Sequence, residues 1–137
     1  MGFEKFGMVD STSEARAGRF VDYLEEGKVM ATRCRDCGKR YLPPRTECSK
    51  CLSVDMEWFE IEPEGRLTTY TTVRYGPAGF EDKAPYTIAV AEFGEGLRML
   101  GHLGGDLRES DIRIGMRVRI TPVKLEGDRV GYEFQVL

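Results

Sequence analysis

Hydrophobic and polar residues alternate with a period of two along most of the chain beyond Arg66, which is the pattern of half-buried β-strands. β-Branched and aromatic residues are frequent in these stretches, as strand propensity favours. Residues 67–73 (Leu-Thr-Thr-Tyr-Thr-Thr-Val) and 86–93 (Tyr-Thr-Ile-Ala-Val-Ala-Glu-Phe) are the clearest examples. The pattern predicts five strands, over residues 66–75, 86–93, 97–103, 116–123 and 130–136.

Turn and crossover signals indicate how these strands connect. Residues 94–96 (Gly-Glu-Gly) and 126–128 (Glu-Gly-Asp) have the composition of hairpin turns. Residues 112–115 form a short crossover segment before the fourth strand. Five strands with one such crossover are typical of a small Greek-key barrel of the OB type. We therefore expect a mainly β protein with a five-stranded OB-fold barrel over residues 63–137.

A helical period replaces the strand period near the N-terminus. Residues 11–14 (Ser-Thr-Ser-Glu) form a capping box, and Gly27 stands where a left-handed C-cap would end a helix. The pattern predicts a helix over residues 12–26, within an N-terminal helical segment of residues 1–29. Its apolar stripe suits packing on its own domain or docking of a partner chain. The stripe consists of Ala17, Phe20, Val21 and Leu24.

All four cysteines of the protein lie in two C-x-x-C hooks, Cys34 with Cys37 and Cys48 with Cys51, separated by ten residues. Two such hooks allow four thiolates to converge on one ion, and tetrahedral zinc prefers that ligand set. With short strands expected on either side, this predicts a zinc ribbon over residues 30–62. Four thiolates leave no open coordination position, so a bound Zn²⁺ would be structural.

Disulfides and iron are the alternatives for these cysteines. The first seven residues include Glu4 and Lys5 and no apolar run follows, so the N-terminus lacks the pattern of a secretory signal. We therefore expect a reducing, cytoplasmic setting, in which disulfides are rare. Iron in a rubredoxin-like electron carrier uses the same four ligands, but softness and geometry favour zinc.

Charge is distributed unevenly along a chain of 137 residues with a net charge of −3. Residues 33–51 carry six basic and two acidic side chains, a basic region that either offsets the zinc–thiolate charge or anchors a phosphate group. Residues 55–64 carry five acidic side chains and no basic one, and we expect a linker there with an ordered Trp58. No stretch has the length and apolarity of a membrane span. The basic residues are Arg33, Arg35, Lys39, Arg40, Arg45 and Lys50.

The sequence lacks the motifs of a self-sufficient enzyme. It has no G-x-S-x-G, no Walker A and no Rossmann glycine pattern, and no fifth cysteine to act as a nucleophile. His102, the single histidine, lies inside a predicted strand, where a histidine is more often structural than a catalytic base. We expect a binding or assembly module with no catalytic residue of its own.

The ordered set of features resembles the DUF35 family over nearly the whole chain. Members of that family join an N-terminal helix and a rubredoxin-like zinc ribbon to an OB-fold domain associated with acyl-CoA. The chain departs from the family pattern in lacking a proline after Phe134 and in its Gly101-His102 pair. The matching residues are Phe20, Leu24-Glu25-Glu26-Gly27, Arg33-Cys34, Cys37-Gly38, Pro43-Pro44-Arg45, Cys48, Cys51, Gly65, Leu67, Thr69-Tyr70-Thr71, Pro85-Tyr86 and Ile114-Gly115.

The resemblance implies a subunit that is not catalytic alone and belongs to a thiolase-type acyltransferase complex. Such a subunit would pair with a thiolase-like catalytic subunit in a hetero-oligomer, complete its acyl-CoA binding site and stabilise the assembly for cleavage or formation of a C–C bond. No membrane and no nucleic acid are expected as partners. The alternative is a single-stranded nucleic-acid-binding protein, since OB barrels and zinc ribbons both occur in that class.

The long loop between the first two barrel strands suits a ligand-binding role. Coenzyme A carries phosphates, which require cations, and an adenine, which requires an aromatic or apolar slot. We expect the cations to come from Arg45, Arg74 and Lys83. The aromatic residues expected to contact the CoA moiety are Tyr75, Phe80 and Tyr86.

Overall fold

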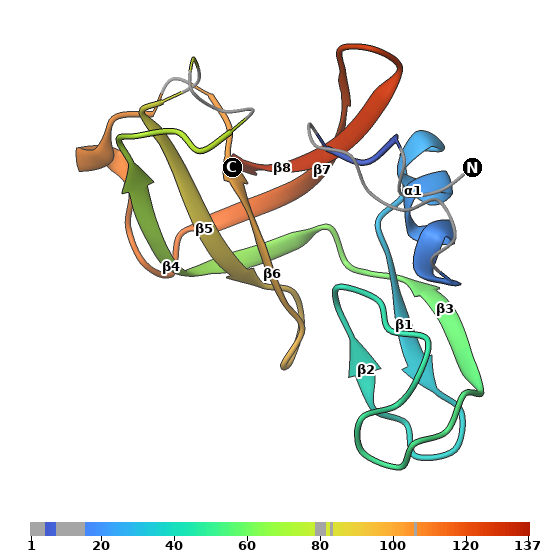
Figure 1. Cartoon of the computed structure of the whole chain (residues 1–137). Coiled ribbons are helices and arrows are strands. Elements are labelled where there is room, and N and C mark those ends of the chain that lie inside the picture. The colour runs from blue at the N-terminus through green and yellow to red at the C-terminus, as the bar shows by residue number, and fades with distance from the viewer. Residues whose placement is uncertain (1–4, 8–15, 79–81, 83, 106) are drawn as a thin grey trace. The chain divides into compact units, whose positions relative to one another are not determined.

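Figure 1 shows the computed structural model of the chain. It describes residues 5–7, 16–78, 82, 84–105 and 107–137. The chain divides into two compact units, one of Met1–Ile61 with Pro122–Gly131 and one of Glu62–Thr121 with Tyr132–Leu137. No helix of the described residues is long and apolar enough to cross a membrane.

The N-terminal helix follows the predicted apolar stripe. A 3₁₀ turn, η2 (Arg16–Gly18), leads into α1 (Arg19–Glu25), whose Phe20, Val21 and Leu24 are buried. The predicted start and capping box fall on residues 8–15, outside the described residues.

The end of the helix is a Schellman motif at the predicted glycine. The N–H of Gly27 donates to the carbonyl of Leu24 at 3.0 Å, and the N–H of Lys28 donates to the carbonyl of Tyr23 at 2.9 Å. These bonds satisfy two carbonyls that the last helical turn leaves without intrahelical partners.

A three-stranded sheet in the order β2-β1-β3 follows the helix. It consists of β1 (Met30–Cys34), β2 (Arg40–Tyr41) and β3 (Met56–Glu60), all antiparallel. β1 and β2 are the strands expected on either side of the first hook. The prediction of a linker over residues 55–64 is wrong, because β3 occupies half of it.

Cross-strand pairing explains why the acidic stretch is a strand. Arg33 stands directly opposite Glu57 in the β1–β3 register, and their side chains form an ion pair. Arg35 contacts both Glu57 and Asp55, at 3.4 and 3.2 Å. Opposite charges on facing strands stabilise the pairing. Glu57 of β3 is therefore matched to Arg33 of β1, and Asp55 just before β3 is matched to Arg35 just after β1. Trp58 lies on this strand with its ring centroid 5.6 Å from that of Tyr23.

The second half of the chain forms the predicted barrel. It is closed, in the order β4-β5-β6-β8-β7, with β6 and β8 parallel and the 3₁₀ turn η3 (Glu109–Asp111) before β7. This order is the OB topology that the crossover signal predicts. The strands are β4 (Glu64–Val73), β5 (Tyr86–Glu92), β6 (Arg98–Leu103), β7 (Arg117–Leu125) and β8 (Arg129–Val136).

The barrel core closes around Phe93 and Phe134, whose ring centroids are 5.8 Å apart and whose side chains are fully buried. Gly65 on β4 lies against this core. A Cβ atom added to Gly65 would stand 2.5 Å from the carbonyl oxygen of Glu92 and 2.7 Å from the Phe93 ring. The glycine therefore allows β4 to approach the end of β5 more closely than any side chain would permit.

We predict that Gly65→Ala destabilises the barrel by roughly 1–3 kcal/mol, because the added methyl meets backbone and ring atoms that cannot move away cheaply. Gly131→Ala is the matched control, since its Cβ would meet only Leu125 and Val123 side chains, at 3.4 and 3.9 Å. Urea unfolding followed by far-UV circular dichroism measures both variants. Equal free energies of unfolding for the two would contradict the close approach.

Candidate metal centre and ligand pocket

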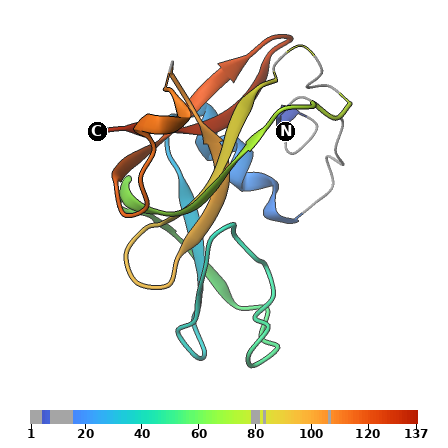
Figure 2. The same cartoon turned by 90° about the vertical axis from the view of Figure 1, so that its left-hand side faces the viewer.

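The four cysteine sulfurs converge at one end of the ribbon sheet, where the two hook loops lie side by side (Figure 2). All four Sγ atoms lie within 4.8 Å of one another, and the Cys34–Cys51 and Cys37–Cys48 pairs are 3.5 Å apart. Zn–S bonds of about 2.3 Å in a tetrahedron place sulfurs about 3.8 Å apart. The donor set therefore fits a tetrahedral metal with every position filled by thiolate.

The two hooks repeat one backbone geometry. In the first, the N–H of Gly38 donates to the carbonyl of Cys34 at 2.8 Å; in the second, the N–H of Leu52 donates to the carbonyl of Cys48 at 2.9 Å. Both donors have positive φ, 82° for Gly38 and 64° for Leu52. Glycine adopts that conformation freely, whereas leucine is strained there by roughly 1–2 kcal/mol. The geometry of the hook thus keeps the backbone of Leu52 in the left-handed conformation, although the residue itself is 82% exposed.

Hydrogen bonds prepare two of the sulfurs for ionisation. The backbone N–H of Cys37 lowers the pKa of Cys34, and the hydroxyl of Tyr41 lowers the pKa of Cys48 to about 5. Cys51 differs: the backbone N–H of Ser53 lowers its pKa, but the neighbouring sulfurs and burial outweigh that effect and raise it to about 12. Four thiolates at this spacing repel one another, and a divalent cation removes that repulsion.

Tyr41 on β2 supports the metal centre from behind the ligands. Its hydroxyl is 3.4 Å from Cys48 Sγ and accepts the backbone N–H of Ser49 at 2.9 Å. The ring is buried with Cys34 and Cys48 in the core of the ribbon. Lys39 and Arg45 both lie over this ring, with Nζ and Cζ at 5.3 and 5.7 Å from its centroid.

Thr32 fixes the turn that follows the two prolines. Its side chain is fully buried, and its hydroxyl donates to the carbonyl of Arg45 at 2.8 Å and accepts the N–H of Arg45 at 2.9 Å. The sequence analysis missed this residue, because its position on β1 has the pattern of an ordinary core residue. Thr32 and Arg45 are 13 positions apart in the sequence, so no local pattern indicates the hydrogen bonds between them.

The predicted basic region is partly neutralised. Arg33 and Arg35 are ion-paired with Glu57 of β3 and with Asp55 just before that strand, and the Arg33 hydrogen bond lowers the pKa of Glu57. Within the described part of the chain, no carboxylate lies within 4.0 Å of Lys39, Arg45 or Lys50. Two of these three cations, Lys39 and Arg45, lie over the ring of Tyr41.

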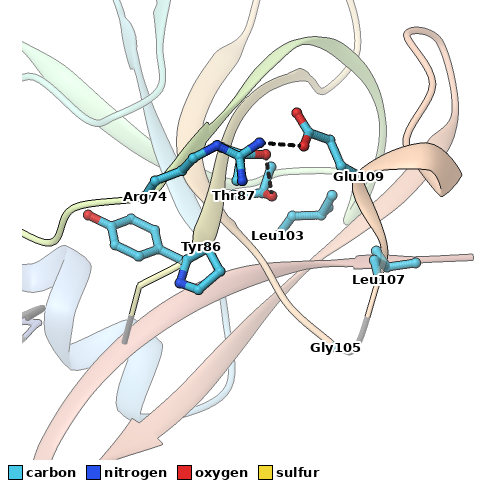
Figure 3. Close-up of a pocket in the computed structure, with 9 residues that line it drawn as sticks. Arg74, Tyr86, Thr87, Leu103, Gly105, Leu107 and Glu109 are labelled. Atoms are coloured by element: carbon cyan, nitrogen blue, oxygen red, sulfur yellow. Dashed lines mark hydrogen bonds and ion pairs between the residues drawn. The ribbon is translucent and has the colours of Figure 1, made fainter. Parts of the chain in front are cut away.

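A cavity of about 290 Å³ opens at one end of the barrel, where β4 ends, β5 begins and β6 ends (Figure 3). Arg74 and Glu109 form an ion pair at 2.9 Å on one side of it. The hydroxyls of Thr72 and Thr87 are 3.4 Å apart within the lining. The lining residues are Thr72, Arg74, Pro85, Tyr86, Thr87, Leu103, Gly105, Leu107 and Glu109.

Two of the six residues predicted to contact CoA, Arg74 and Tyr86, line this pocket. Tyr75 is 92% exposed and does not line the pocket, and Arg45 lies on the ribbon. Phe80 and Lys83 lie outside the described residues. Sequence reasoning missed Glu109, because its pairing with Arg74 spans 35 positions and leaves no local pattern.

His102 on β6 stacks on the ring of Tyr86. The ring centroids are 5.0 Å apart and the planes differ by 3°. In the β5–β6 register His102 stands opposite Ile88, and in the β6–β8 register it stands opposite Glu133. The histidine thus packs on an aromatic residue at the rim of the pocket.

A four-cysteine ribbon and a closed five-stranded barrel define the class of zinc-ribbon and OB-fold proteins. The ribbon matches the family model described as "ChsH2, rubredoxin-like zinc ribbon domain" over residues 21–57. The barrel matches the model described as "ChsH2, C-terminal OB-fold domain" over residues 58–122. These matches support a structural zinc in the ribbon.

The chain belongs to the DUF35 domain family. It is 35% identical to a "DUF35 domain-containing scaffold protein" of Methanocaldococcus jannaschii over 114 residues, which cover 78% of this chain and 80% of that relative. It is 24% identical over 107 residues to the "Benzoylsuccinyl-CoA thiolase subunit BbsA" of Geobacter metallireducens, covering 75% and 70% of the two chains. The fold also matches a chain of the "Ltp2-ChsH2(DUF35) aldolase" structure, with a TM-score of 0.78, 24% identity and coverage of 92% and 98%.

We predict that Tyr41→Phe weakens zinc binding by about 10–100-fold, because it removes the hydroxyl that donates to Cys48 while leaving the ring in the core. Competition with a chromophoric chelator measures the affinity. Tyr86→Phe is the control, since it also removes a tyrosine hydroxyl but from a strand of the barrel, not from the core of the ribbon. An unchanged affinity in Tyr41→Phe would show that the hydroxyl does not support the metal.

Proposed function

We propose that the chain is a non-catalytic accessory subunit of a thiolase-superfamily enzyme. It completes the acyl-CoA binding site of its partner and stabilises the complex for cleavage or formation of a C–C bond. The name of its relative BbsA, a benzoylsuccinyl-CoA thiolase subunit, supports this assignment. The "scaffold protein" name of the archaeal relative supports the assembly role.

The observation that carries the proposal is the pocket at the end of the barrel. Its volume of about 290 Å³ is at the lower end of the range of roughly 300–1,000 Å³ for small-molecule pockets. Coenzyme A is larger than a drug-sized ligand, so the pocket has room for only part of it. A pocket of this size suits a subunit that contributes one portion of a site and leaves the reacting end to another chain.

The lining supplies the groups that a portion of CoA requires. Arg74 offers a guanidinium, which binds phosphate in a bidentate manner, and Tyr86 offers a ring whose orientation is fixed by stacking on His102. Glu109 holds Arg74 in the absence of ligand and competes with a phosphate for it. Arg45 on the ribbon, with its main chain fixed by Thr32, is a further cation that the subunit offers for phosphate.

The ribbon contributes structure to this function. When bound, zinc would hold the two hooks together and so fix the turn that carries Arg45, without taking part in any reaction. The thiolase-like partner would supply the cysteine and histidine of the chemistry.

The test is co-expression with a thiolase-superfamily subunit from the same genome, followed by calorimetric titration of the purified complex with CoA. Arg74→Met is expected to weaken CoA binding about tenfold, as loss of one charged hydrogen bond does. Glu109→Gln is expected to strengthen it, because the competing carboxylate is gone. Lys124→Met, which changes a cation outside the pocket lining, is the control.

Two outcomes would contradict the proposal. One is a chain that fails to co-purify with the thiolase-like subunit. The other is a complex whose affinity for CoA is the same in the wild type, Arg74→Met and Glu109→Gln.

A further inference from the structure

The outer face of the barrel over β4, β5 and β6 carries a continuous set of uncharged side chains. In the register of these strands Val90 stands between Thr69 and Leu100, and Ile88 stands between Thr71 and His102. Residues paired in this way point to the same side of a sheet, and alternate residues along a strand do so as well. We call the following six residues the apolar face: Val73, Tyr86, Ile88, Val90, Leu100 and His102.

Burial shows that this face is the outward one. The intervening residues Ala89, Ala91 and Met99 are at most 3% exposed, so their side chains point into the barrel. None of the six residues of the apolar face is buried, and Leu100 is 56% exposed. Leucine, isoleucine and valine side by side on the outside of a closed barrel are not needed for its core, and such a patch indicates a binding surface.

Charged residues border the apolar face at one end. Arg66, Glu92 and Arg98 stand opposite one another on β4, β5 and β6. Arg98 is paired with Glu92 at 3.3 Å, whereas Arg66 donates to the carbonyl of Gly115 at 3.1 Å. Among the described residues, no carboxylate lies within 4.0 Å of Arg66, which leaves one unbalanced positive charge beside the uncharged centre.

This arrangement has the anatomy of a protein–protein interface, an apolar centre with a polar rim. A single-stranded nucleic acid would require a groove of cations together with stacking aromatics. The apolar face offers two aromatic rings, Tyr86 and His102, which stack on each other, and the rim offers one arginine without a carboxylate partner among the described residues. The charge pattern instead complements an apolar protein surface with a carboxylate at one edge, opposite Arg66.

We propose that the apolar face is the surface on which the thiolase-like subunit docks, through an apolar strip flanked by an acidic residue. The identity of this partner rests on the function proposed above. The position of the surface does not, since it follows from the register and burial of β4, β5 and β6. The centre of the contact is Leu100, the most exposed aliphatic side chain on the face.

The test compares two exposed leucines in the co-expressed complex. Leu100→Asp is expected to weaken binding of the thiolase-like subunit at least tenfold, as loss of a central apolar contact does, and Arg66→Glu is expected to weaken it less. Leu52→Asp, on the zinc ribbon and 82% exposed, is the matched control and should leave the affinity unchanged. Biolayer interferometry measures each affinity, and thermal unfolding checks that each variant is folded. If Leu100→Asp does not fold, Leu100→Ser replaces it in the test.

The outcomes separate the docking surface from the proposed function. A wild-type chain that forms no complex would contradict both. A wild-type complex whose affinity is unchanged in Leu100→Asp would overturn the docking surface and leave the proposed function standing. Light scattering that shows a dimer of the isolated chain, dissolved by Leu100→Asp, would assign the face to a second copy instead. Binding of a single-stranded oligonucleotide that Leu100→Asp abolishes would also overturn the proposal.

Discussion

Cys34 and Cys48 are at once metal ligands and core residues of the ribbon. They form its buried cluster with Tyr41, and among the described residues Met56 is the partly buried hydrophobic side chain packed against that cluster. A sheet with strands of five, two and five residues has too little apolar surface to fold on burial alone. The convergence of four thiolates on one ion supplies the missing stability. The positions of Tyr41, of the two hooks and of the turn that carries Arg45 all depend on it.

The barrel solves the same problem by ordinary packing. Fully buried Phe93, Phe134, Leu67 and Val118 fill its interior, and Gly65 lets the strands close around them. With the interior filled, the open end and the outside of the barrel are the surfaces left for binding. The pocket at that end and the apolar face over β5 share Tyr86; the pocket suits a small molecule and the face suits a protein.

Local patterns predicted most of the fold. The C-x-x-C spacing predicted the metal centre, the 3.6-residue period predicted Phe20, Val21 and Leu24 as buried, and the period of two predicted the barrel strands to within about two residues at each end. β3 was missed because its acidic residues have the composition of a linker. Its strand conformation depends on pairing of Glu57 with Arg33 and Arg35, which are 24 and 22 positions away. The Arg74–Glu109 pair and the Thr32–Arg45 link escaped for the same reason: each joins residues that only the fold brings together.

The most direct test of this account is hydrogen–deuterium exchange of the purified chain before and after zinc is removed with a chelator. If the ion supplies the core of the ribbon, amides of β1, β2, β3 and the two hooks will lose their protection, while amides of β5 and β6 in the barrel will keep theirs. Protection that persists in the ribbon without zinc would contradict the account, and so would simultaneous loss of protection in the barrel.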